Sequence, residues 1–190
     1  MAPSDSSLGA TREAGRNKEK HEALQSALSQ LSSGYPLKIL AITNGSDTGL
    51  DTLQRFGSLT LFTHSAHEPE QHPGALAAQD MGGDALDLPL AFTHGFDIVY
   101  LSGLLGQADK GRTLLRQCFR ALHGKGALLI PFSSGLFTFL SRKEINRQHC
   151  TLARLKEISE HLFAVETPFL GFPFRRTHLA VLRKERTLES

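Results

Sequence analysis

Histidines and glutamates are concentrated in one short stretch of this 190-residue sequence, where they could bind a metal or move a proton. The stretch holds His64, His67 and His72 together with Glu68 and Glu70. Imidazole and carboxylate groups are common metal ligands and general bases. Their spacing here fits no established ligand pattern, so a solvated polar loop is the favoured interpretation and we predict no metal site.

A second group of side chains could bind phosphate. It consists of five basic residues in the C-terminal third of the chain: Arg142, Lys143, Arg147, Arg175 and Arg176. No recognised nucleic-acid-binding motif accompanies them, and scattered arginines are usually solvated. The pattern therefore does not favour a nucleic-acid partner.

Charge is distributed unevenly along the chain, although the net charge is only +2. Residues 41–109 carry one basic and nine acidic residues, a balance of −8, whereas residues 110–190 carry fifteen basic and six acidic residues, a balance of +9. Such asymmetry can indicate a cationic ligand at one end and an anionic partner at the other. Equally, folding can bring the two halves together so that their charges compensate.

The length and composition predict a single compact domain. Hydrophobic residues make up 40% of the chain, enough for a core. Residues 1–16 are rich in Ser and Gly and predict a mobile tail, so the domain is expected at residues 17–190. No apolar run approaches the roughly 20 residues that cross a bilayer, and the first residues do not resemble a signal peptide, so we expect a cytoplasmic protein. Cys118 and Cys150 match neither a disulfide framework nor a zinc site and are expected to be free thiols.

Apolar runs alternate with amphipathic stretches along most of the chain. The runs predict strands over residues 37–43, 58–63, 83–88, 96–101, 127–132, 163–169 and 177–183. The amphipathic stretches predict helices over residues 17–31, 50–56, 114–122 and 152–162. Parallel strands need crossovers of helical length, whereas the last two predicted strands have no helix between them. The sequence therefore predicts an α/β, three-layer Rossmann-like sandwich with a mostly parallel sheet and a C-terminal antiparallel edge hairpin.

Three consecutive segments carry a more specific resemblance. They are GDALDLP at residues 83–89, FDIVYLSGLL at residues 96–105 and LLRQCFRALHGKGALLI at residues 114–130. In this order they are similar to the class I S-adenosylmethionine-dependent methyltransferases, especially the small-molecule O-methyltransferases. The resemblance extends over residues 37–184 and implies S-adenosylmethionine as cofactor.

The resemblance also implies where the cofactor would bind. It places Asn44, Gly45, Ser46, Asp47 and Thr63 around the methionine and ribose. Asp84 and Ala85 would lie near the adenine, although Asp84 could equally be an ordinary strand-end aspartate.

The cofactor turn departs from the family's acidic-x-Gly-x-Gly-x-Gly pattern. Residues 41–47 read AITNGSD, which keeps one glycine of the three and lacks the leading acid. The second predicted strand ends in Thr63 and His64, where a ribose-binding carboxylate is expected. Asp47 replaces the third glycine, so its carboxylate could repel the methionine carboxylate, cap the following helix or contact the cofactor's amino group.

The catalytic residue is not assigned by the resemblance. Related O-methyltransferases commonly have a histidine after the fourth strand, but this chain has Gly106 there. His94, which precedes that strand, is the nearest alternative base. Phe169, Phe172 and Phe174 would lie beside an acceptor pocket for an apolar or aromatic small molecule, or would simply pack the hairpin.

Two functions follow from these features. The first is methyl transfer from S-adenosylmethionine to a small acceptor, in which positioning could suffice without a strong base. The second is a methyltransferase-like protein that no longer methylates, acting as a partner subunit or as a cofactor-independent natural-product enzyme. Its partner would then be a protein, in a homo- or heterodimer, or another small-molecule substrate.

Overall fold

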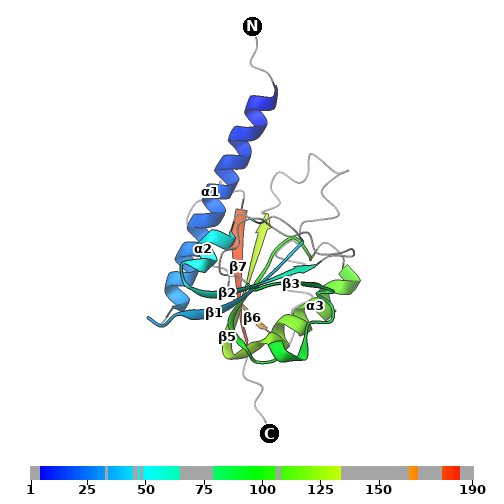
Figure 1. The fold of residues 1–190 in the computed structure, drawn as a ribbon. Helices are drawn as coiled ribbons and strands as arrows, with labels where there is room; N and C mark the ends of the chain where they lie inside the picture. Colours follow the sequence, from blue (N-terminus) through cyan, green and yellow to red (C-terminus); the bar gives the residue numbers. More distant parts are fainter. Residues whose placement is uncertain are drawn as a thin grey trace.

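A seven-stranded sheet forms the centre of the molecule (Figure 1). The structure is a computed structural model and describes residues 5–32, 34–44, 47, 49–64, 79–105, 108–133, 163–166 and 177–184. The strands are β1 (Leu37–Thr43), β2 (Gly57–His64), β3 (Gln79–Gly83), β4 (Phe96–Leu101), β5 (Leu122–Ser133), β6 (Phe163–Glu166) and β7 (Thr177–Lys184). The helices are α1 (Asp5–Leu31), α2 (Leu50–Gln54) and α3 (Ala108–Ala121), with a 3-10 turn, η1, at Leu90–Phe92. The predicted helix at residues 152–162 lies outside the described residues.

The order of the strands is β3-β2-β1-β4-β5-β7-β6. The first five are parallel and follow the 3-2-1-4-5 order of doubly wound nucleotide-binding folds. β7 pairs antiparallel with both β5 and β6, and β6 forms the edge. The predicted α/β sandwich with a C-terminal antiparallel edge hairpin is therefore confirmed.

Helices cover both faces of the sheet because the buried strands are apolar on both sides. Ile39 and Ala41 of β1 pack in the core formed with α1 and α2, whereas Leu40 and Ile42 pack in the core formed with α3. Figure 1 shows α1 and α2 on one side of the sheet and α3 on the other. A strand that is apolar on both faces reads as a continuous hydrophobic run, which is why β1 was predictable.

The N-terminal helix is longer than the sequence pattern indicates. α1 begins at Asp5, within the stretch expected to be a mobile tail, and its first turns extend beyond the sheet (Figure 1). Leu24 and Leu28, farther along α1, are fully buried against the sheet. The domain boundary at residue 17 and the mobility of the residues before it stay predictions. No helix in the described part of the chain is long and apolar enough to cross a membrane.

The third strand lies earlier than expected. β3 is Gln79–Gly83 and pairs with β2, whereas the predicted strand at residues 83–88 is a turn that follows it. Ala85 and Leu88 are buried in that turn, which gives it the spaced apolar residues of a strand without sheet pairing. The prediction for residues 83–88 was therefore wrong, and β3 is defined by its pairing rather than by hydrophobicity.

Candidate functional site

β2 and β3 lie on one side of β1, whereas β4 and β5 lie on the other, so the order of the parallel strands reverses between β1 and β4. We call the side of the sheet where the parallel strands end the carboxyl edge. The last residues of β1, β2, β3 and β4 there are Thr43, His64, Gly83 and Leu101. Ligands of open α/β sheets bind beyond this edge, at the point where the order of the strands reverses. The residues that follow β1 and β4 are therefore the centre of the candidate site.

Asn44 and Gly103 meet across this reversal. The side-chain amide of Asn44 donates to the Gly103 carbonyl at 3.4 Å, and the Ser102 amide donates to the Ile42 carbonyl at 3.0 Å. Gly103 has a φ of +79°, and a Cβ there would lie 2.5 Å from Asn44 Oδ1. The site therefore requires a glycine at position 103. In the sequence, the signal for it is a Ser-Gly pair directly after a buried strand.

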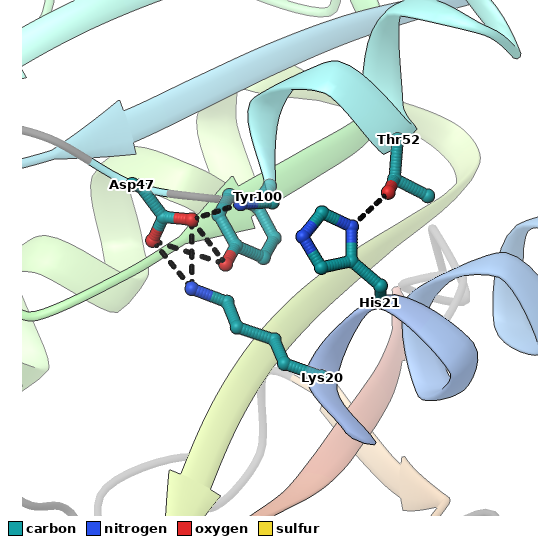
Figure 2. A network of polar contacts seen from close by, with 6 residues as sticks. Lys20, His21, Asp47, Thr52 and Tyr100 are labelled. Carbon is teal, nitrogen blue, oxygen red and sulfur yellow. Dashed lines mark hydrogen bonds and ion pairs between the residues drawn. The ribbon is translucent and has the colours of Figure 1, made fainter. Parts of the chain in front are cut away.

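Asp47 lies beside this reversal and takes part in a buried polar network (Figure 2). Its two carboxylate oxygens accept hydrogen bonds from Lys20 Nζ at 2.7 and 2.8 Å. The Tyr100 hydroxyl donates to the same oxygens at 3.3 and 3.2 Å, and the Gly49 amide donates to Oδ1 at 2.7 Å. The Asp47 carboxylate thus fixes the start of α2 through the amide of Gly49, the residue before the helix, and the Leu50 amide donates to the Asp47 backbone carbonyl at 3.4 Å.

The electrostatics of Asp47 follow from this pairing. Burial alone raises its pKa, but the Lys20 ammonium and hydrogen bonds from Lys20, Ser102 and Gly49 outweigh burial and hold the pKa below its usual value. Burial, with the Asp47 charge beside it, raises the pKa of Tyr100 well above its usual value. The network is therefore an ionised Asp–Lys pair joined by a neutral tyrosine.

The lowered pKa predicts a stability contribution that depends on pH. The charged form of Asp47 is favoured in the folded state, so its contribution is present above the unfolded pKa of about 4 and is lost as pH falls through the lower folded value. Urea unfolding should show the gap in stability between wild type and Asp47→Asn becoming smaller at pH 2.5 than at pH 7. For Asp87→Asn, an exposed control, we expect little change; an equal gap at both pH values for Asp47→Asn would contradict the assignment.

At the ends of β2 and β3, the predicted ribose and adenine residues lie together. His64 Nδ1 accepts the Ala85 amide at 3.2 Å and lies 3.7 Å from Asp84 Oδ1. Asp84 Oδ1 accepts the Leu86 amide at 2.9 Å, yet its side chain remains 60% exposed. Thr63 is buried within β2. β2 ends in His64 and not in a carboxylate, so the described residues at this part of the edge offer a histidine and the accessible carboxylate of Asp84.

Other predicted site residues are not brought to the carboxyl edge. His94 precedes β4 and contacts the carbonyl of Leu122, where β5 begins, so it lies at the opposite end of the sheet. A base at position 94 therefore does not join the candidate site. The positions of Gly45, Ser46, Phe169, Phe172 and Phe174 lie outside the described residues. Among the residues that are described, no three His, Cys, Asp or Glu side chains gather to hold a metal ion.

Comparison with known proteins supports the fold through structure and not through sequence. No family model and no curated protein matches the sequence. Among solved structures, the pyocyanin biosynthetic protein PhzM is 16% identical with a TM-score of 0.61, over 85% of this chain and 54% of that protein. This chain thus spans about half the length of PhzM.

Two further structures match over most of both chains. The 1,6-didemethyltoxoflavin-N1-methyltransferase of Burkholderia thailandensis, solved with S-adenosylhomocysteine, is 18% identical with a TM-score of 0.60, over 95% of this chain and 86% of the enzyme. A Thermotoga maritima S-adenosylmethionine-dependent methyltransferase, described as a possible histamine N-methyltransferase, is 15% identical with a TM-score of 0.64, over 94% and 96%. With the strand order above, these likenesses show that the chain has the fold of the class I S-adenosylmethionine-dependent methyltransferases.

Proposed function

We propose that the chain binds S-adenosylmethionine along its carboxyl edge and transfers the methyl group to a small, apolar or aromatic acceptor. The observation that carries the proposal is the junction of Asn44 with Gly103 at the point where the strand order reverses. It supplies a polar side chain and a close approach of two backbone segments where ligands of such sheets bind.

The described residues fit the two ends of the cofactor better than its middle. Asn44 is exposed and can bind the amino-acid portion, and the accessible carboxylate of Asp84 can accept from the amino group of adenine. Among the described residues, the ribose would meet Thr63 and His64, neither of which carries a carboxylate. The Asp47 carboxylate is paired with the Lys20 ammonium, so we do not propose Asp47 as a direct ligand of the cofactor.

The chemistry asks little of the protein beyond this positioning. When bound, the cofactor supplies the electrophilic methyl group on its sulfonium. The chain's own task is to orient the acceptor nucleophile in line with that methyl group and to exclude water, which can account for much of the rate enhancement. Methyl transfer is therefore compatible with a site that has a glycine, Gly106, where a catalytic histidine is common.

Isothermal titration of the protein with S-adenosylmethionine and S-adenosylhomocysteine tests the proposal. We expect both to bind, with micromolar dissociation constants of about 1 to 100 μM, as enzymes commonly bind substrates near their working concentrations. Absence of binding by both at millimolar concentration would overturn the proposal.

A second candidate function is favoured by one specific contact. The Ala85 amide, expected near the adenine, already donates to His64 Nδ1. This backbone donor on the adenine side is therefore already satisfied by a side chain of the protein and is not free to bind the cofactor. Such a site would suit a protein that does not methylate and instead supports a partner. Purification of the full chain with a stoichiometric protein partner, together with failure of titration, would favour this alternative.

A further inference from the structure

We propose that Lys20 of α1 neutralises Asp47 and thereby allows the turn after β1 to accept a ligand that carries a carboxylate. This inference rests on the proposed function, because S-adenosylmethionine carries such a group on its amino-acid portion. Lys20 would act through Asp47 and not by touching the ligand, so it is a positioning residue.

The contacts join two distant segments of the chain. Lys20 lies on α1, 27 positions before Asp47, and its ammonium contacts both carboxylate oxygens (Figure 2). The Lys20 side chain is 15% exposed and that of Asp47 is 5% exposed, so water screens the pair poorly. The Lys20 ammonium also lies 5.7 Å from the centre of the Tyr100 ring, which favours a cation at this place.

An unpaired Asp47 would be unfavourable for a nearby anion. Asp47 lies in the turn that follows β1, three residues after Asn44 and beside the reversal of strand order. A buried carboxylate there repels a ligand carboxylate because both are negatively charged, and the low dielectric constant of the surroundings strengthens this repulsion. Lys20 removes the net charge of the pair, so the turn can tolerate an aspartate where the methyltransferase pattern has glycine.

A purely structural role for Lys20 predicts something different. If Lys20 only held α1 or the turn in shape, removing the charge of Asp47 as well would not restore the affinity that the loss of Lys20 had lowered. If Lys20 acts by neutralisation, its loss would weaken ligands with a carboxylate and spare those without one. Two adenosine thioethers make this comparison possible, because S-adenosylhomocysteine carries the amino-acid group and 5′-methylthioadenosine lacks it.

The experiment measures the affinities of both ligands for wild type, Lys20→Met and the double variant Lys20→Met/Asp47→Asn. Methionine keeps the length of the lysine stem and removes the charge. For Lys20→Met we expect a loss of about tenfold or more in affinity for S-adenosylhomocysteine, and a change of less than about threefold for 5′-methylthioadenosine. In the double variant the carboxylate is gone, so affinity for S-adenosylhomocysteine should recover to within about threefold of wild type.

Lys18→Met is the matched control, since Lys18 is an exposed lysine on the same helix. It should leave both affinities unchanged, and circular dichroism should establish that each variant is folded. Equal losses for the two ligands in Lys20→Met, no loss for either, or no recovery in the double variant would overturn the inference. If wild type binds neither ligand, it is the proposed function that fails; if Lys20→Met does not fold, the double variant still tests the inference, since loss of S-adenosylhomocysteine binding there would overturn it.

Discussion

Replacement of Gly57 by alanine should lower the free energy of unfolding by at least about 3 kcal/mol, at the upper end of the cost of overpacking. Gly57 begins β2 and pairs in register with Leu37, the first residue of β1. A Cβ at position 57 would lie 1.9 Å from the Leu37 carbonyl oxygen and 2.5 Å from its amide nitrogen. These are backbone atoms of a central strand, so they cannot rotate away as a side chain would.

Gly124→Ala is the matched control for this substitution. Gly124 lies in β5, and a Cβ there would meet nothing within 4 Å, so we expect a change within about 0.5 kcal/mol. Urea unfolding of both variants at neutral pH measures the difference. Similar stabilities for Gly57→Ala and Gly124→Ala would show that β1 and β2 do not approach as described.

Lys20→Met should lower the free energy of unfolding by about 3 to 5 kcal/mol at neutral pH, because it leaves the buried Asp47 carboxylate without its cation. Most of this loss comes from the unpaired charge rather than from the missing lysine. The double variant Lys20→Met/Asp47→Asn should therefore recover at least half of it.

The exposed residue Lys18 again provides the control. Lys18→Met should change the free energy of unfolding by less than about 0.5 kcal/mol. Additive losses from the two substitutions at Lys20 and Asp47, with no recovery in the double variant, would mean that the two side chains do not interact in solution.

Much of the fold could be predicted because the central strands are buried on both faces. β1 and β4 have the predicted boundaries, since both are short runs of apolar residues bounded by turn residues. Strands joined by helix-forming stretches require a parallel sheet, and the missing helix before β7 indicated the antiparallel edge. These conclusions need only local sequence and the chain connectivity.

Edge elements and long-range contacts could not be predicted in the same way. β3 contains Gln79 and Asp80, and it is a strand only because β2 pairs with it. The early start of α1 at Asp5 likewise has no apolar stripe to indicate it.

The location of the candidate site could be predicted from the sequence, but the contacts among its side chains could not. The strand that precedes Asn44 indicated the carboxyl edge, and a capping role was among the alternatives for Asp47. The partner Lys20 is 27 residues away on another element, so no local pattern could connect the two. His94 shows a different failure, because a residue directly before a parallel strand lies at the amino end of the sheet, away from the ligand-binding edge.

Hydrogen–deuterium exchange with and without S-adenosylhomocysteine both detects binding of this ligand and locates it along the sheet. If the cofactor binds at the carboxyl edge, we expect slower exchange in the segments that follow β1, β3 and β4, at residues 44–49, 84–88 and 102–105. Segments at the opposite end of the sheet, residues 93–97 and 122–126, should be unchanged. Unaltered exchange at the carboxyl edge, or protection confined to the opposite end, would contradict the claim that this edge binds the cofactor.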